Sequence, residues 1–252
     1  MQLHITSTWW CRIDDDCRIV TEYLPSLASA SKIGKPFSRT HYQYILQDKK
    51  TDITQLLPVM EHFYTIQGEG YHQGRAAYFV RLGGCDVGCV WCDVKESWDA
   101  SIHPKLSVET IVSLIQKTPA KLVVITGGEP LMHSLDNLTM ALQEAGFETN
   151  IETSGAHPLS GRWNWICLSP KKFKAPLPAI VPLAHELKVV IFHKSDFEWA
   201  EKYASQVSDS CKCYLQPEWD KAAEVTPLID EYIKANPRWE LSLQIHKYIE
   251  VP

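Results

Sequence analysis

The sequence predicts an α/β protein whose strands form a partial, open barrel of the TIM type. Short apolar segments alternate with segments whose apolar residues recur at helical spacing, as in a parallel sheet covered by helices on its outer face. We count about six such strand–helix units, too few for the eight of a closed barrel. In this architecture ligands bind at the carboxyl ends of the strands, so residues that follow a strand are the candidates for function.

The predicted elements begin with a buried strand at residues 76–82, which leads into a loop rich in cysteine. The other predicted strands are short, mostly apolar runs bounded by turn residues: 121–126, 147–153, 164–169, 186–191, 211–216 and 239–244. The predicted helices have apolar residues at helical spacing: 107–117, 135–146, 195–206 and 221–236. Ser107 is expected to cap the first helix and Gly146 to end the second.

Residues 1–47 differ from the rest because they show no sustained hydrophobic period and carry turn-forming Ser, Pro and Gly. We expect them to be an N-terminal extension, either a disordered segment or the product of a wrongly assigned start codon. Residues 48–252 are expected to form the single functional domain, with organised sequence beginning near Leu56.

The composition excludes several classes of function. The formal net charge of -5 gives no basic field for nucleic acid, and the run from Lys171 to Lys174 is most simply a solvated face. No segment approaches the roughly 18 to 20 apolar residues that span a bilayer, and the N-terminus lacks the layout of a signal peptide. We therefore expect a cytoplasmic protein with neither nucleic acid nor membrane as a partner, whose eight cysteines are thiols or metal ligands.

Three cysteines follow the first predicted strand within eight residues, in the pattern C-x3-C-x2-C: Cys85, Cys89 and Cys92. A structural zinc needs a fourth ligand, and neither His72 nor His103 stands in a paired motif. A 4Fe–4S cluster normally takes four thiolates, so three would leave one iron open to another ligand. The spacing favours this open cluster, and a zinc-bound interaction module without catalysis is the alternative.

The C-x3-C-x2-C pattern followed by "GGEP" resembles the radical S-adenosylmethionine (SAM) enzymes. The resemblance implies the partial barrel of that superfamily and a 4Fe–4S cluster on Cys85, Cys89 and Cys92. It also implies SAM on the open iron, cleaved by one electron to a 5′-deoxyadenosyl radical.

A longer series of motifs resembles the 7-carboxy-7-deazaguanine synthase family: "FYTIQGEG", "RLGGC", "TGGEP", "ETSG", "SPK", "QPEW" and "LSLQIHKYIEVP". These motifs span residues 63–252 in order. The resemblance implies a lyase that converts 6-carboxy-5,6,7,8-tetrahydropterin to 7-carboxy-7-deazaguanine with loss of ammonia, towards queuosine. It also implies a homodimer and an electron donor such as a flavodoxin. A radical activase acting on a partner protein is the alternative.

The resemblance also implies which residues bind the substrate: Ile66, Gln67, Gly68, Glu69, Arg81, Thr126, His246 and Pro252. The residue types suit a pterin that carries a carboxylate. Gln67 offers a donor and an acceptor to the ring edge, and the planar fork of Arg81 matches a carboxylate. The alternatives are a turn acid for Glu69, an outward surface residue for Arg81 and a surface residue for His246.

The residues that the resemblance places at the cofactor are Trp91, Asp93, Gly128, Glu129, Ser169, Pro170, Lys171, Gln216, Pro217, Glu218 and Trp219. No side chain is assigned to catalysis, because the radical is generated on the cofactor. Trp219 could equally be a core residue. Members of the family usually carry Thr after Cys-Asp, where its hydroxyl contacts magnesium, but this chain has Val94. We expect a weaker role for magnesium, or compensation by Glu96 or Ser97.

Overall fold

The computed structural model describes residues 9–13, 19–23 and 51–252, which belong to two compact units, Met1–Lys50 and Thr51–Pro252. In the first unit β1 (Trp9–Ile13) pairs antiparallel with β2 (Ile19–Tyr23). Most of the expected N-terminal extension, residues 1–47, lies outside the described residues. Everything below concerns the second unit.

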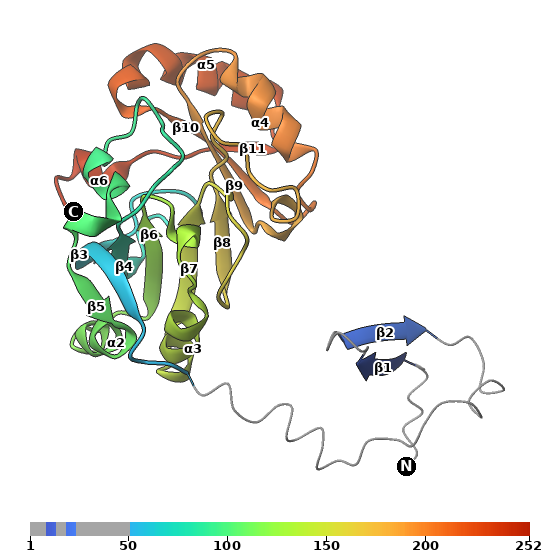
Figure 1. Cartoon of the computed structure of the whole chain (residues 1–252). Coiled ribbons are helices and arrows are strands. Elements are labelled where there is room, and N and C mark those ends of the chain that lie inside the picture. Colours follow the sequence, from blue (N-terminus) through green and yellow to red (C-terminus); the bar gives the residue numbers. More distant parts are fainter. Residues whose placement is uncertain (1–8, 14–18, 24–50) are drawn as a thin grey trace, which may run out of the picture. The chain divides into compact units, whose positions relative to one another are not determined.

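The second unit contains a nine-stranded sheet in the order β11-β10-β9-β8-β7-β6-β4-β3-β5. Seven strands run parallel: β4 (Ala76–Leu82), β6 (Leu122–Gly127), β7 (Glu148–Thr153), β8 (Trp165–Leu168), β9 (Glu186–Ile191), β10 (Lys212–Pro217) and β11 (Trp239–Leu241). The bounds of the first six agree closely with the prediction, whereas β11 ends three residues before the predicted end at residue 244. The sheet curves without closing, so the predicted partial barrel is confirmed (Figure 1).

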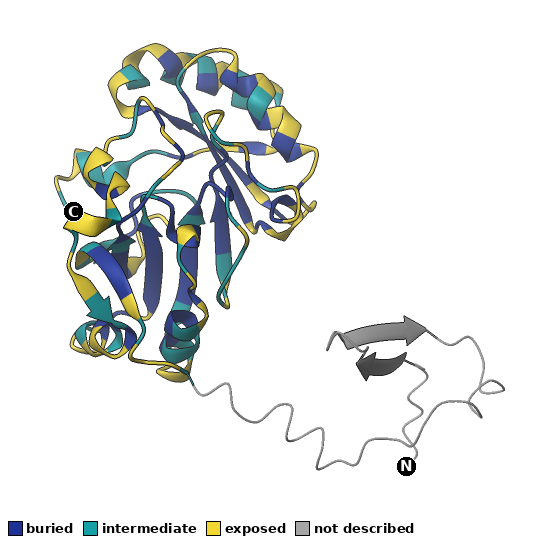
Figure 2. Cartoon of the chain, in the orientation of Figure 1, coloured by how far each residue is buried: buried dark blue, intermediate teal, exposed yellow. Residues whose placement is uncertain are grey.

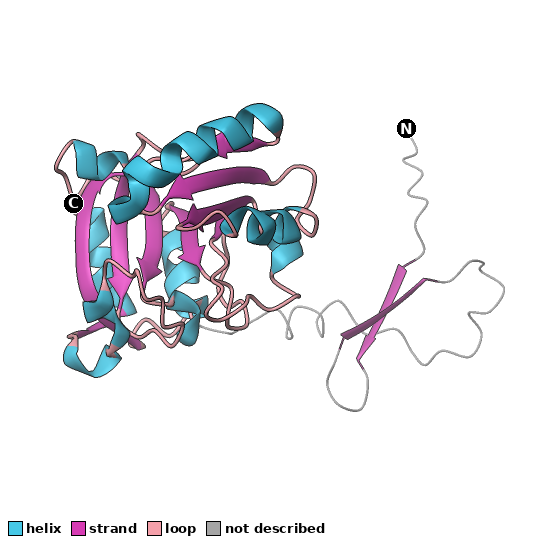
Figure 3. Ribbon diagram, turned by 90° about the horizontal axis from the view of Figure 1, so that it is seen from above, coloured by secondary structure: helices cyan, strands magenta, loops and turns pink. Residues whose placement is uncertain are grey.

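Four helices correspond to the predicted ones: α2 (Val108–Gln116), α3 (Asp136–Glu144), α4 (Asp196–Ala204) and α5 (Ala222–Ala235). They lie along one face of the sheet (Figure 3). The Ser107 hydroxyl accepts from Thr110 N at 3.1 Å, which confirms the expected cap. Two connections between successive parallel strands lack an α-helix: β7 leads to β8 through a loop, and β8 leads to β9 through a segment with one 3-10 turn at Val181–Leu183.

Two strands were not predicted, β3 (Leu56–Ile66) and β5 (Lys105–Ser107), and both are antiparallel. Only Leu56–Pro58 pairs with β5, so the rest of β3 forms an edge of the sheet. Several side chains of β3 are exposed, among them Glu61 and His62. These polar residues interrupt the apolar run that marks a buried strand.

The two faces of the sheet have different chemistry because successive side chains point to opposite sides. On β4, Tyr78, Val80 and Leu82 join the large core beneath the helices, whereas Ala77 and Phe79 belong to a small apolar cluster on the inner face. The strands are buried throughout their central parts (Figure 2). Beyond that small cluster, the inner face carries the polar residues of the candidate site.

Among the described residues, no helix has both the length and the apolar character that crossing a membrane would require.

Candidate active site

A cavity of about 270 Å³ opens at the carboxyl ends of the parallel strands. It is lined by every expected substrate residue, by the three cysteines of the loop and by nine of the eleven expected cofactor residues. The two exceptions are Glu129 and Pro170. The topology thus gathers residues from Ile66 to Pro252 around one space.

The cysteine loop begins where β4 ends and is held by backbone hydrogen bonds. Gly84 N donates to Ser97 O at 2.6 Å, and Cys85 N donates to Trp98 O at 3.1 Å. Gly128, in the turn after β6, packs directly against this loop, because a side chain there would place its Cβ 2.7 Å from the Cys85 Cβ. The close approach of the two turns requires glycine at this position.

The three loop cysteines are free thiols that pack in one small cluster and all line the cavity. Burial raises the pKa of Cys89 to about 11, so its deprotonation requires a positive partner such as a bound metal. In the described part of the chain, no three His, Cys, Asp or Glu side chains converge on a single ion. A 4Fe–4S cluster makes no such demand, because each thiolate binds a different iron. The donor set therefore fits the cluster.

Glu129 lies behind the turn that contains Gly128. Its carboxylate accepts from Thr153 Oγ1 at 2.5 Å, from Leu131 N at 3.0 Å and from the hydroxyl and backbone N–H of Ser154. The side chain thus ties the ends of β6 and β7 together. Its expected contact with the methionine amino group stays a prediction, as does the cofactor contact of Pro170.

A charge cluster formed by Glu69, Lys188 and Glu152 also lines the cavity, with Lys188 buried and the two carboxylates half-buried. The Lys188 ammonium forms an ion pair with Glu69 and lies 3.8 Å from Glu152 Oε1. Burial alone would raise the pKa of Glu69, but the Lys188 charge and its hydrogen bond lower that pKa to about 2. Burial would likewise lower the pKa of Lys188, and the two carboxylates raise it well above its usual value. Glu69 and Lys188 are therefore both ionised at neutral pH.

Sequence reasoning missed Lys188 and Glu152. Lys188 stands in the middle of "ELKVVI", where a charged residue inside an otherwise apolar strand was the available signal. Glu152 opens the quoted motif "ETSG". It accepts from Gln67 Nε2 at 2.9 Å and from Thr126 Oγ1 at 3.3 Å, which links two of the expected substrate residues.

The cavity is completed by contacts between the two ends of the open sheet. After β3 the chain forms the loop 67–71, and after β11 it forms the segment 242–246, which leads to the C-terminus beside β3 (Figure 1). Ile245 N donates to Gly68 O at 3.0 Å, and Gln244 Nε2 donates to Glu69 Oε1 at 2.8 Å. Gly70 N donates to the Ser242 hydroxyl at 2.9 Å. We call the segment 242–246 the C-terminal latch.

Two expected residues on the substrate side have partners of their own. Arg81 Nε donates to Glu61 Oε1 on β3 at 2.6 Å, which leaves the rest of the guanidinium beside the cavity. The His246 ring packs against Gly68, and burial lowers the pKa of His246. Neither residue is an outward surface side chain.

On the cofactor side, Lys171 is half-buried. Its Nζ donates to Ser169 Oγ at 2.6 Å and lies 5.2 Å from the centre of the Trp91 ring, and burial lowers the pKa of Lys171. Asp93 pairs with Lys247 at 2.7 Å, and Lys247 lies 5.1 Å from the Trp219 ring. Trp219 is therefore a rim residue of the cavity and not part of the core.

The position expected to contact magnesium is occupied by Val94, which lines the cavity. Neither residue expected to compensate is among those that line the cavity. The Ser97 hydroxyl is buried and donates to Val94 O at 2.6 Å, and the Glu96 side chain is exposed. The alternative that Glu96 or Ser97 replaces the threonine hydroxyl finds no support in this geometry.

Comparison with known proteins gives a consistent result. The Radical SAM superfamily model matches residues 79–166. The 7-carboxy-7-deazaguanine synthase of Flavobacterium psychrophilum is 53% identical over 198 residues, which are 79% of this chain and 94% of that protein. The synthase of Synechocystis sp. is 48% identical over 199 residues, 79% of this chain and 95% of that protein. The crystal structure of QueE from Escherichia coli matches with a TM-score of 0.66 and 35% identity, and it covers 75% of this chain and 93% of that one.

Proposed function

The chain belongs to the 7-carboxy-7-deazaguanine synthase family of radical SAM enzymes, and we propose that it converts 6-carboxy-5,6,7,8-tetrahydropterin to 7-carboxy-7-deazaguanine and ammonia in this cavity. The observation that carries the proposal is that one cavity holds both the three cysteines and the Glu69–Lys188–Glu152 cluster. The first set suits an iron–sulfur centre, and the second suits a polar heterocycle.

The charge cluster matches the hydrogen-bonding groups of a pterin. The aminopyrimidinone edge of that ring presents N–H donors, for which ionised Glu69 and the carboxyl oxygens of Glu152 are acceptors. The charge of Lys188 keeps Glu69 ionised in a site where its carboxylate would otherwise carry a large desolvation cost. The Arg81 guanidinium is the group suited to the substrate carboxylate.

The cysteine end of the cavity suits the cofactors. Cys85, Cys89 and Cys92 would hold a 4Fe–4S cluster, with SAM against the turn of Gly128 and the residues Ser169, Lys171 and Gln216. When bound, the cluster and SAM supply a 5′-deoxyadenosyl radical that abstracts hydrogen from the substrate. The chain's own task is to orient both ligands and to exclude water, and the C-terminal latch contributes by spanning the gap between the sheet edges.

The test is anaerobic reconstitution with iron and sulfide, followed by assays with dithionite as reductant. We expect SAM cleavage that depends on the pterin, together with ammonia and a deazapurine product. If the reconstituted protein cleaved SAM but left the pterin unchanged, the synthase assignment would fail and activation of a protein partner would be favoured. A protein that held only zinc would favour the interaction module.

Three further features are proposals from family membership. We propose a flavodoxin as the electron donor, a homodimer as the assembly and the cytoplasm as the location. The free thiols of the described cysteines suit a reducing compartment. Analytical ultracentrifugation of the reconstituted enzyme tests the dimer.

Magnesium should matter less here than in family members with threonine, because Val94 offers no oxygen to the ion. We expect little change in turnover when magnesium is removed by a chelator. The Val94→Thr variant should gain a magnesium dependence. A large, saturable stimulation of the unaltered chain by magnesium would contradict this expectation.

A further inference from the structure

The inner face of the sheet carries a row of polar side chains that crosses four strands. In the strand register, Arg81 on β4 lies opposite Glu61 on β3 on one side and opposite Thr126 on β6 on the other. Thr126 Oγ1 donates to Glu152 Oε2 at 3.3 Å, which continues the row onto β7. Arg81, Thr126 and Glu152 line the cavity. Glu61 stands at the outer end of the row and is not among the lining residues, and the function proposed above assigns it no task.

The contact between Glu61 and Arg81 involves one particular nitrogen of the guanidinium. Arg81 Nε donates to Glu61 Oε1 at 2.6 Å. Among the hydrogen bonds of the described residues, none uses the two terminal nitrogens of Arg81. A planar guanidinium binds a carboxylate through two parallel N–H groups, either from Nε and one terminal nitrogen or from both terminal nitrogens. Because Glu61 occupies Nε, a carboxylate in the cavity is left with the edge formed by Nη1 and Nη2.

Glu61 is also the neighbour best able to fix the orientation of Arg81. The next row on the same face consists of Phe63 and Phe79, which lie opposite each other, line the cavity and stack with ring centroids 5.4 Å apart. These side chains carry no oxygen or nitrogen. Thr126, on the other side of Arg81, gives its hydroxyl hydrogen to Glu152. The Arg81 side chain is only 20% exposed, so water competes little for its N–H groups and the bond to Glu61 holds its rotation.

We propose that Glu61 is a positioning residue that makes the site select a tetrahydropterin with a carboxylate. It acts through Arg81, whose Nη1 and Nη2 edge it turns toward the cavity before any ligand arrives. A flexible arginine would lose side-chain freedom on binding, so an arginine that is already held in place binds the same carboxylate more tightly. The inference rests on the proposed function, because it takes Arg81 as the partner of the substrate carboxylate.

The test measures ligand binding by anaerobic calorimetry on the reconstituted holoenzyme, with SAM present and no reductant, so that the pterin is not consumed. The two probes are 6-carboxy-5,6,7,8-tetrahydropterin and 5,6,7,8-tetrahydropterin, which lacks the carboxylate. Glu61→Ala removes the acceptor of Arg81 Nε, whereas Glu61→Gln keeps an oxygen there without the charge. Arg81→Ala, alone and combined with Glu61→Ala, shows whether Glu61 acts through Arg81.

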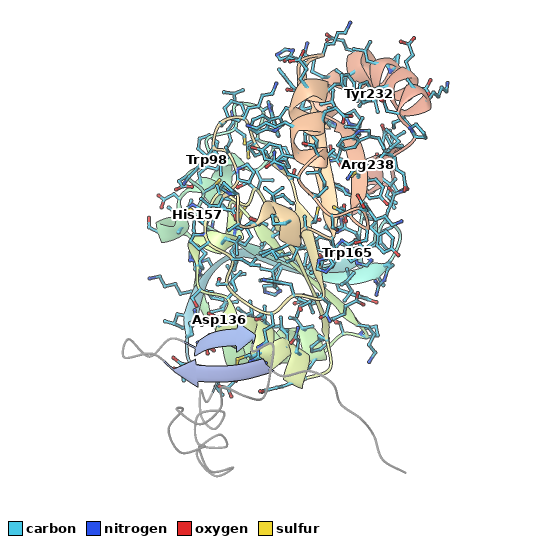
Figure 4. All side chains as sticks on the ribbon, turned by 90° about the vertical axis from the view of Figure 1, so that its right-hand side faces the viewer. Trp98, Asp136, His157, Trp165, Tyr232 and Arg238 are labelled. Carbon is cyan, nitrogen blue, oxygen red and sulfur yellow. The ribbon has the colours of Figure 1, made fainter. Side chains whose placement is uncertain are left out.

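Asp230→Ala is the matched control, because it also removes the carboxylate of an exposed ion pair. Asp230 lies on α5, where its Oδ2 is 2.7 Å from Lys234 Nζ. Figure 4 shows Tyr232, on the same helix, on the opposite side of the view from Trp98, which lines the cavity. The Glu61 side chain is 43% exposed, so its loss should leave the midpoint of denaturant unfolding nearly unchanged, as in the control.

We expect Glu61→Ala to bind the carboxylated pterin roughly tenfold more weakly than the parent, because Arg81 loses a hydrogen bond to a charged group. Its affinities for the pterin without a carboxylate and for SAM should match those of the parent. Glu61→Gln should recover most of the loss. In the Arg81→Ala background, adding Glu61→Ala should have no further effect. The control should resemble the parent in every measurement.

Three results would overturn the positioning role of Glu61. Unchanged binding of the carboxylated pterin by Glu61→Ala is the first, and equal weakening for both pterins, as a merely structural role requires, is the second. The third is a Glu61→Gln variant as weak as Glu61→Ala, which would assign the effect to charge and not to position. Failure of the proposed function would show differently, as no deazapurine from the parent with dithionite.

Discussion

Lys188 is the residue on which the polar end of the cavity depends, because it is the cation shared by two carboxylates on the inner face of the sheet. Its Nζ pairs with Glu69 and approaches Glu152, which itself binds Gln67 and Thr126. Removing one member of a buried ion pair leaves an uncompensated charge, which costs far more than a surface pair would. The cluster therefore acts as a unit.

We expect Lys188→Met to lower the free energy of unfolding by about 3 to 5 kcal/mol and to abolish turnover, since Glu69 and Glu152 would be left buried without a cation. Denaturant unfolding and the pterin assay measure the two effects. Lys212→Met, at an exposed position on β10, is the matched control and should change neither. Adding Glu69→Gln to Lys188→Met should recover part of the lost stability. If the loss of stability in the double variant equalled the sum of the losses in the two single variants, the two residues would not share a cluster.

Glu69 should also make the free energy of unfolding depend on pH. Its pKa is about 2 in the folded chain against an unfolded value near 4.5, so ionised Glu69 stabilises the fold. This contribution, on the order of 3 kcal/mol, is fully present above about pH 4.5 and is lost as the pH falls towards 2. Unfolding of the parent and of Glu69→Gln, measured between pH 6 and pH 3, should give curves that converge at the acid end. Parallel curves would show that Glu69 is not held in its charged form.

At the scale of elements, the site depends on how the C-terminal latch meets the loop after β3. The Ser242 hydroxyl accepts from Gly70 N at 2.9 Å and donates to Gln216 Oε1 at 2.8 Å. Gly70 belongs to the loop expected to hold the pterin, and Gln216 lines the cavity on the expected cofactor side. One buried hydroxyl thus connects the two halves of the site without lining the cavity itself.

Ser242→Ala should raise the KM for both the pterin and SAM, because Gly70 N and Gln216 Oε1 each lose a buried partner. A loss of about 1 to 3 kcal/mol of binding free energy corresponds to a dissociation constant that is roughly 5- to 150-fold higher. Ser160→Ala is a suitable control, since the Ser160 hydroxyl likewise joins two segments, through Leu135 N and His133 O, away from the cavity. If Ser242→Ala affected only one ligand, the hydroxyl would not couple the two halves.

The elements also show what the sequence could and could not predict. The parallel strands were found because both of their faces are covered, so an apolar run marks each one. The edge strand β3 was missed because its exposed residues interrupt that run. The expected substrate residues could be carried over by resemblance, and all of them line the cavity. Lys188 and Ser242 could not be found in this way, since their partners are brought together only by the curvature of the sheet and the return of the chain after β11.

At the scale of the whole molecule, the chain divides into two compact units, and the site belongs to one of them. The described residues that line the cavity all lie between Phe63 and Pro252, within the unit Thr51–Pro252. The relatives from Flavobacterium psychrophilum and Synechocystis sp. match only 79% of this chain while being covered over 94% and 95% of their own length. The aligned region is therefore nearly the whole length of these two relatives, whereas about a fifth of this chain lies outside it.

We propose on these grounds that the N-terminal unit is an extension to a self-sufficient synthase domain. A chain that begins at Thr51 should bind iron, cleave SAM and turn over the pterin with kcat and KM within about twofold of the full chain. Its midpoint of denaturant unfolding should also be unchanged, because the described residues of the large core all lie from Leu57 onward. Parallel assays of the full and shortened chains with dithionite provide the measurement. A shortened chain that folds with the same midpoint yet loses more than tenfold in activity would show that the N-terminal unit takes part in the reaction.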